Sequence, residues 1–203
     1  MAIYNTPSDS ANTAVRSFLK KIGEEYYGQS YNTGSGRGKK VWLTIKEDEF
    51  EGCCAYCGEK TESVSIEHLI MFNREQCGLH HPGNTVPCCR SCNTRTKNDE
   101  KFYHDWETHL GAIIEEKGGS ISELNKRKKR IRNHMDKWAY PNLSSDEENA
   151  IRAIAHSFMK EFKRRFQRAV LYIESWTEPS FKEEGPETVT NSSPRPRSGC
   201  STR

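Results

Sequence analysis

Residues 54–97 read CAYCGEKTESVSIEHLIMFNREQCGLHHPGNTVPCCRSCNTRTK, and this stretch decides how the chain can fold. It contains two CxxC pairs, the first formed by Cys54 and Cys57 and the second by Cys89 and Cys92. A spacer of two residues lets both sulfur atoms of a pair reach one tetrahedral ion. The two pairs together therefore predict a structural Zn²⁺ site with four thiolate ligands.

Polar residues of the kinds found in catalytic sites lie between the two CxxC pairs and directly after the second pair. Glu67 and His68 are adjacent in SIEHLI. Asn84 lies in GNTVP, and Asn93 directly follows the last cysteine of the second pair. A zinc ribbon that only stabilises a fold needs none of these residues, so the pattern indicates a functional site built on the zinc site.

With these residues in this order, the chain from about residue 43 to residue 97 resembles the HNH endonucleases, in the zinc-stapled branch of the ββα-metal nucleases. In that family a strand ends in an acid–histidine pair, a second strand holds an asparagine, and a helix supplies the third site residue. Glu67–His68, Asn84 and Asn93 match these three steps in turn. The whole combination is specific, whereas either CxxC pair alone would be a weak signal.

The resemblance implies a DNA endonuclease that hydrolyses phosphodiester bonds. His68 would be the general base, a role that suits an imidazole with an ordinary pKa of about 6.5. Glu67 and Asn93 would bind one catalytic Mg²⁺ or Mn²⁺ through oxygen ligands, and Asn84 would brace the loop between the strands. Family members often have Asp and His at the positions of Glu67 and Asn93.

Cations that could contact DNA phosphates follow the second CxxC pair and recur in a basic run. KRKKRIR at 126–132 places six cations in seven residues of a chain whose net charge is only +3. A solvated charged helix is the alternative interpretation of such a run, but a phosphodiester-cleaving core must also hold its substrate. The candidate nucleic-acid-binding residues are Arg95, Lys97, Lys126, Arg127, Lys129 and Arg130.

The composition favours a small core that a metal helps to stabilise. Of the 203 residues, 33% are hydrophobic and 29% are charged, so a large uninterrupted core is not expected. The predicted fold class is α+β, a small ββα-metal core with its four-cysteine zinc site, surrounded by N- and C-terminal helices. The expected divisions are 1–42, an N-terminal helix and linker; 43–112, the nuclease core; 113–177, a helical region with the basic helix; and 178–203, a disordered tail.

Periodicity and turn signals predict the individual elements. Strands are expected at 64–69 and 85–88, and a Gly- and Ser-rich linker at 29–40. The expected helices are 12–27, a short one opening at 44–47, one from Asn93 onward, 122–138, and a long one capped by 145–148.

Several features exclude other classes of protein. No stretch approaches the roughly 20 apolar residues of a membrane span, and the N-terminus has no secretory signal pattern. We therefore expect a cytoplasmic protein, in which CxxC pairs indicate metal rather than disulfides. Cys53 and Cys88 offer an alternative CxxxC register.

The other histidines and cysteines carry no clear signal. His80 and His81 are interpreted as loop residues, and His104 and His109 as surface or packing residues. Cys77 and Cys200 have no evident partner.

Three functions remain open from the sequence. The first is a metal-dependent endonuclease for double-stranded DNA, of the restriction or phage-defence kind. The second is a nuclease effector subunit that acts with a partner ATPase or sensor. The third is a non-catalytic zinc-dependent module that binds nucleic acid. A homodimer is compatible with each of them.

Overall fold

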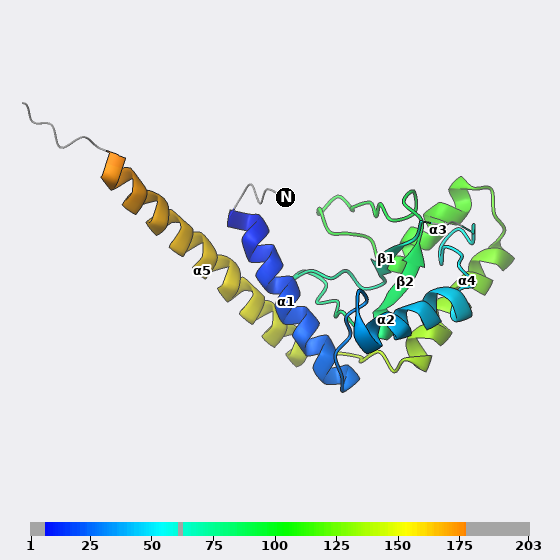
Figure 1. Ribbon diagram of the computed structural model, residues 1–203. Helices are drawn as coiled ribbons and strands as arrows, with labels where there is room; N and C mark the ends of the chain where they lie inside the picture. Colours follow the sequence, from blue (N-terminus) through cyan, green and yellow to red (C-terminus); the bar gives the residue numbers. More distant parts are fainter. Residues whose placement is uncertain (1–6, 61–62, 178–203) are drawn as a thin grey trace, which may run out of the picture. The chain divides into compact units, whose positions relative to one another are not determined.

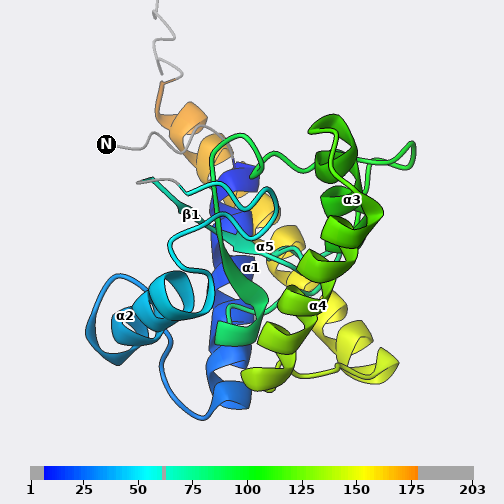
Figure 2. The same ribbon diagram turned by 90° about the vertical axis from the view of Figure 1, so that its right-hand side faces the viewer.

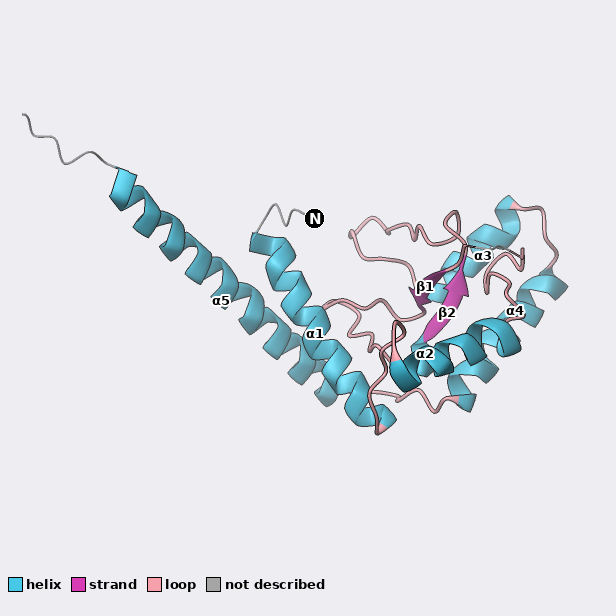
Figure 3. Ribbon diagram, in the orientation of Figure 1, coloured by secondary structure: helices cyan, strands magenta, loops and turns pink. Residues whose placement is uncertain are grey.

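The computed structural model describes residues 7–60 and 63–177 of the chain. Within them lie five α-helices and one antiparallel pair of strands (Figure 3). The predicted α+β class is thus confirmed, with helices before and after the strands in the chain. The described residues up to Gln167 belong to one compact unit and those from Arg168 to a second. The predicted disordered tail at 178–203 and Cys200 lie outside the described residues.

Helix α1, Pro7–Tyr27, packs along the first part of α5, Ser145–Thr177 (Figures 1 and 2). Ala11, Val15 and Leu19 recur every four residues on its buried face, which is the spacing of an amphipathic helix. The same apolar cluster includes residues of α5 and of the loop between the strands, so α1 joins these two parts of the unit.

The contact between α1 and the loop is especially close at Gly23. A side chain there would place its Cβ 2.5 Å from the carbonyl oxygen of His80, which is shorter than real contacts allow. Cys77 and Leu79 of the same loop are buried in the cluster with α1. Glycine at position 23 therefore lets the helix backbone lie directly against the loop.

The linker predicted at 29–40 is shorter than expected. Helix α2 begins at Gly36 and runs to Leu43, and it continues into the π-helix η1, Thr44–Glu49. The predicted short helix at 44–47 is therefore the second half of a longer helical segment. Tyr31, in the remaining linker, is fully buried, and its hydroxyl lies 2.7 Å from that of Thr85.

The two predicted strands are confirmed as β1, Ser65–His68, and β2, Thr85–Cys88. They pair antiparallel with His68 opposite Thr85. A 3₁₀ turn, η2, Pro82–Asn84, leads directly into β2. This register brings the end of β1, where His68 lies, next to Asn84 at the entrance to β2.

The helix predicted from Asn93 onward is wrong. Residues 93–105 contain turns and one bridge, between Lys97 and Tyr103, and helix α3 begins only at Trp106 and ends at Glu116. Local turn chemistry explains the difference, because the Asn98 side chain accepts a hydrogen bond from the Phe102 N–H and closes a tight turn.

The helix predicted at 122–138 is confirmed as α4, Ile121–Lys137. Glu49, at the end of η1, fixes its C-terminal part. The carboxylate accepts hydrogen bonds from His134, Lys137 and Trp138, at 2.7, 2.9 and 2.9 Å. Such a shared carboxylate holds the end of α4 against the segment that leads into the first CxxC pair.

The long C-terminal helix is confirmed as α5, but its cap lies one residue before the predicted position. Ser144 and Glu147 form the capping box, in which the Ser144 N–H donates to the Glu147 carboxylate at 2.7 Å. None of the described helices combines the length and the apolar character of a membrane span.

Candidate functional site

The four cysteines of the two CxxC pairs form one buried cluster near the sheet. Their sulfur atoms all lie within 4.8 Å of one another. The Sγ atoms of Cys57 and Cys89 are 3.8 Å apart, and a tetrahedron of Zn–S bonds of about 2.3 Å places its sulfurs about 3.8 Å apart. The cluster, which consists of Cys54, Cys57, Cys89 and Cys92, is therefore consistent with a structural Zn²⁺ site.

The surroundings of Cys54 favour the thiolate form that a metal needs. A hydrogen bond with the Cys88 thiol, followed by the backbone N–H groups of Cys89, Cys57 and Tyr56, lowers the pKa of Cys54 to about 4 despite its burial. Cys53 and Cys88 are not members of the cluster, so the CxxC register is confirmed over the CxxxC alternative. Cys88 instead packs beside the cluster as a buried thiol.

His68 lies at the end of β1 and is half-buried. One face of its ring stacks on Phe72, with centroids 4.7 Å apart and planes 15° from parallel. Its Nε2 lies 3.0 Å from Nδ1 of His80, in the loop between the strands. Burial lowers the pKa of His68 to about 3, and the nearby His80, Arg16 and Arg95 contribute in the same direction. His68 is therefore neutral at physiological pH.

Asn84 is completely buried and holds the beginning and the end of the loop between the strands. Its Oδ1 accepts a hydrogen bond from the Ile70 N–H at 2.7 Å, and its Nδ2 donates to the carbonyls of Ile70 and Leu79 at 2.9 and 2.8 Å. These bonds fix the loop two residues after His68 and one residue before His80. The sequence cannot show this set of partners, because an asparagine in PGN also suits an ordinary turn.

Glu67 and Arg95 form a buried ion pair. The Arg95 guanidinium donates to the Glu67 carboxylate, and the side chains are 2% and 9% exposed. The same guanidinium donates to the carbonyls of His68 and Leu69 at 3.2 and 2.9 Å and to the Tyr56 hydroxyl at 2.8 Å. Arg95 thus binds protein groups at the end of β1, and its side chain is not placed to contact DNA.

The two predicted ligands of a catalytic metal do not meet in this structure. The Glu67 carboxylate is bound by Arg95, and the Asn93 side chain donates a 2.6 Å hydrogen bond to the Ser65 hydroxyl. As they lie, these side chains form no common set of oxygen ligands for Mg²⁺ or Mn²⁺. Lys97 lies over the ring of Tyr103, with 4.6 Å from its nitrogen to the ring centroid.

The basic run at 126–132 lies on α4 and is largely neutralised by acids. Four of its six cations form ion pairs, two of them with Glu107 of α3. Within the part of the chain that the structure describes, Lys126 and Lys129 have no such partner. The pairs are Arg127 with Glu123, Lys128 with Glu107, Arg130 with Glu51, and Arg132 with Glu107.

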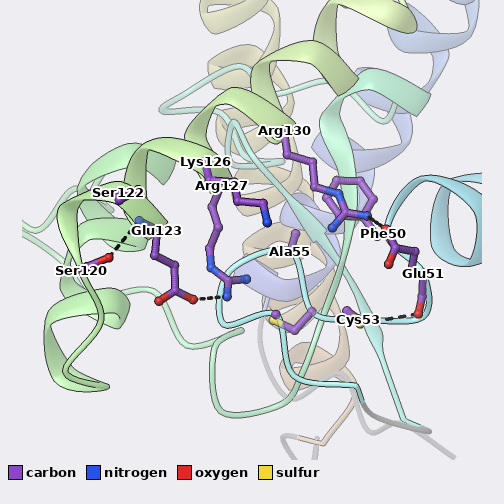
Figure 4. Close-up of a pocket in the computed structure, with 12 residues that line it drawn as sticks. Phe50, Glu51, Cys53, Ala55, Ser120, Ser122, Glu123, Lys126, Arg127 and Arg130 are labelled. Atoms are coloured by element: carbon purple, nitrogen blue, oxygen red, sulfur yellow. Dashed lines mark hydrogen bonds and ion pairs between the residues drawn. The ribbon is translucent and has the colours of Figure 1, made fainter.

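Helix α4 and the first CxxC pair enclose a pocket of about 450 Å³ (Figure 4). Lys126, Arg127 and Arg130 line it from α4, and Phe50 lines it from the end of η1. Figure 4 shows Arg127 directed toward Glu123, and its guanidinium lies so close to Gly58 that a Cβ there would be 2.2 Å from Nη1. Arg127 therefore packs over the first CxxC pair, whereas Lys126 forms no ion pair within the part of the chain that the structure describes.

Two residues near His68 carried no functional prediction from the sequence. The sequence indicates only a loop residue at His80, and Arg16 lies within the helix predicted at 12–27. Arg16 is exposed and has no ion pair among the described residues, yet its charge acts on His68. Only the cations of α1 could have been noticed in the sequence. Arg16 and Lys20 lie four residues apart, which places both on the polar side of the helix.

Comparisons with protein-family models, with curated proteins and with solved structures find no significant match to this chain. The residues and their geometry must therefore support any functional interpretation.

We expect one zinc ion per chain, and we expect Cys92→Ala to lose it. Because the ion replaces part of a small core, its loss should destabilise the fold by about 4 kcal/mol or more, which lowers the Tm of a chain of this size by roughly 10 °C. Elemental analysis and thermal unfolding measure both effects. Cys53→Ala is the matched control, since Cys53 neighbours the cluster without joining it; equal behaviour of the two variants would contradict the site.

Stability should fall as the pH is lowered from about 6.5 toward 4. Burial lowers the pKa of His68 to about 3 and of His80 and His81 to about 4, so the unfolded chain binds protons that the folded chain does not. Each histidine should cost about 1 kcal/mol between pH 7 and pH 5.5. Denaturant unfolding at both pH values, with zinc content checked, measures the loss.

His81→Asn isolates one of these contributions. The His81 side chain accepts a hydrogen bond from the Gly83 N–H at 3.1 Å, which an asparagine oxygen can replace. The variant should lose about a third of the pH dependence; an unchanged dependence would show that His81 does not stay neutral in the folded protein.

Proposed function

We propose that this chain is a DNA endonuclease of the HNH type that uses His68 as its general base. The observation that carries the proposal is the state of this histidine. It is neutral and half-buried, and it lies at the end of a strand, directly before a loop that Asn84 fixes. A histidine that only packs in a core would not need a neighbouring cationic helix face.

Electrostatics supports a phosphodiester as the substrate. The charge of Arg16 reaches His68 and that of Lys20 reaches His80, both from α1. A bound phosphodiester would be attracted to these cations, and its negative charge would raise the pKa of His68. The histidine then becomes a stronger base when substrate is present, which suits its task of taking a proton from the attacking water.

A divalent cation belongs to the proposal through the resemblance. In the HNH family, Mg²⁺ or Mn²⁺ stabilises the charge that develops on the phosphate and on the leaving oxygen. Glu67 and Asn93 are the candidate ligands, but Arg95 and Ser65 bind them in this structure. Cleavage assays with Mg²⁺, with Mn²⁺ and with a chelator test whether the activity needs the ion.

By the resemblance of its motif alone, we extend the proposal to a restriction or phage-defence nuclease in the cytoplasm. A nuclease subunit that needs an ATPase or sensor partner, or a homodimer, would have the same central residues. A zinc-dependent module that only binds nucleic acid is the candidate from another class. The ion pairs on α4 count against this last function, since they neutralise much of the basic surface it would use.

His68→Ala should reduce cleavage of plasmid DNA by about 10²–10⁴-fold, because it removes the general base. Zinc content, Tm and DNA affinity should change little, since the His68 side chain is not part of the four-cysteine cluster. Cleavage is measured with Mg²⁺, with Mn²⁺ and with a chelator.

The control for this variant is His156→Ala, which removes an exposed histidine of α5. Equal cleavage by the two variants would exclude His68 as the base. If the wild type binds DNA but cuts nothing with either ion, a binding module or a recruited subunit becomes the better interpretation.

Two matched double variants test the DNA contacts of α4. Lys126→Gln with Lys129→Gln removes the two unpaired cations and should reduce the slope of log affinity against log salt by up to about 1.8, or about 0.9 per lost phosphate contact. Arg127→Gln with Arg130→Gln removes the same charge but breaks ion pairs with Glu123 and Glu51, so it should lower the Tm more than the slope.

Binding titrations at several salt concentrations distinguish these effects. A slope that the lysine variant leaves unchanged would show that α4 does not contact DNA. The helix would then have only the structural role that its ion pairs already give it.

A further inference from the structure

One wall of the pocket between α4 and the first CxxC pair is a single face of α4. Ser122, Lys126 and Arg130 follow one another at intervals of four residues, and Arg127 lies next to Lys126. Residues at this spacing share one side of a helix. Figure 4 shows the three basic side chains extending from α4 toward the loop that carries the first CxxC pair. The wall formed by α4 is therefore cationic.

The opposite wall comes from the segment that runs from the end of η1 through the first CxxC pair. Phe50 is buried, and the Arg130 guanidinium lies over its ring, 5.1 Å from the centroid. Gly58 has a φ of +71° and no side chain, so the Arg127 guanidinium can lie directly against it. Contacts across the pocket thus hold both arginines in place, and a preorganised site loses less entropy when a ligand binds.

The acids at the pocket do not cancel its positive charge. Glu123 pairs with Arg127. Glu51 pairs with Arg130. Lys126 has no ion pair within the described part of the chain, so one cation of the lining stays uncompensated. A guanidinium has several N–H groups, so an arginine that is bound to one carboxylate can also donate to a second anion. The pocket therefore favours an anionic ligand.

One donor at the pocket lacks an acceptor. Nε of Arg127 is buried and has no hydrogen-bond partner among the described residues. Glu123 binds Nη2 of the same guanidinium and leaves Nε unsatisfied. A buried N–H without an acceptor costs free energy, and native proteins satisfy nearly all such groups with protein, water or a ligand. A ligand oxygen bound at this guanidinium would remove that cost.

The size of the pocket indicates more than a simple anion. Its volume of about 450 Å³ lies within the range of about 300–1,000 Å³ that is typical of small-molecule sites. A phosphate group alone is much smaller, so the rest of the ligand has to fill the cavity. The Arg130 side chain is 42% exposed, and a flat guanidinium is a surface on which nucleobases stack. The pocket thus combines a cationic helix face with a platform for a planar ring.

We propose that this pocket binds a phosphate monoester on a molecule of nucleotide size, with the phosphate at Lys126 and Arg127 and a planar ring on Arg130. At pH 7 a phosphate monoester carries a charge of about −1.5 to −2, which suits a cationic helix face. The site is separate from His68, which does not line the pocket. The proposal does not rest on the proposed nuclease function, since no bond of the ligand is broken.

Calorimetric titration of the full-length protein with 5′-AMP, without added Mg²⁺, tests the binding. We expect a Kd of about 1 mM or tighter. Adenosine lacks the phosphate and should bind at least about 10-fold more weakly, and inorganic phosphate should compete with 5′-AMP. Failure of 5′-AMP to bind at about 10 mM, or equal binding of adenosine, would overturn the proposal.

Two variants locate the site on α4. Lys126→Gln removes the uncompensated cation and should raise the Kd for 5′-AMP about 10-fold. Ser122→Glu places a carboxylate on the same helix face and should raise this Kd by a similar factor. An acid in the first turn of α4 also stabilises the helix, so the Tm of Ser122→Glu should not fall and lost binding cannot come from unfolding.

Lys129→Gln is the matched control, because it removes an unpaired cation of the same helix that does not line the pocket. Its Kd for 5′-AMP should equal that of the wild type. Equal Kd values for the wild type and all three variants would place the nucleotide elsewhere and overturn the proposal.

A trinucleotide distinguishes a free nucleotide from the end of a nucleic-acid strand as the source of the phosphate. If the 5′-phosphorylated trinucleotide binds more tightly than 5′-AMP and Lys126→Gln weakens it, the strand end is the ligand. Weaker binding of the trinucleotide supports a free nucleotide, and both results support the phosphate site. Displacement of 5′-AMP by a duplex without terminal phosphates would instead make the pocket part of a DNA-binding surface and overturn a separate site.

These titrations measure no cleavage. A wild type that cuts no DNA therefore overturns the nuclease and leaves the nucleotide site standing. A wild type that cuts DNA but binds no 5′-AMP overturns the nucleotide site alone.

Discussion

The convergence of four sulfur atoms is the constraint on which the rest of this fold depends. Two short segments separated by more than thirty residues meet at the cluster, and the strand pair lies between them in the chain. β2 ends directly before Cys89, so the second CxxC pair fixes the end of that strand. A chain with few apolar residues gains in this way a centre that it could not build from side-chain packing alone.

Arg95 connects the second CxxC pair to the end of β1. It follows Cys92 by three residues, and its guanidinium binds one carboxylate and the carbonyls of His68 and Leu69. A buried charge pair is costly to break, because each partner would be left desolvated and alone. The backbone that carries His68 is therefore fixed by Arg95 from the side of the second CxxC pair and by Asn84 from the side of the loop.

The parts that could be predicted from the sequence are those that local spacing determines. The CxxC register, both strands, α4 and α5 follow from patterns of a few residues. One failure has a local cause, and the others involve long-range partners. The helix expected at Asn93 gave way to a turn centred on Asn98, and Arg95 has its partners near position 67, far away in the chain. The basic run on α4 looked free because two of its three acidic partners, Glu107 and Glu51, lie outside α4.

The absence of a side chain at Gly23 bears on whether residues 43–112 could be transferred to another protein. Residues 43–112 contain the cysteines and His68, so they look like a cassette that could be moved between proteins. The surface behind His80, however, is the backbone of α1, fitted to it at a distance that only glycine permits. Tyr31, which packs on the His80 ring, also lies outside that range. A transplanted segment would keep its four clustered cysteines and lose the surface against which His80 packs, so α1 would have to be transferred with it.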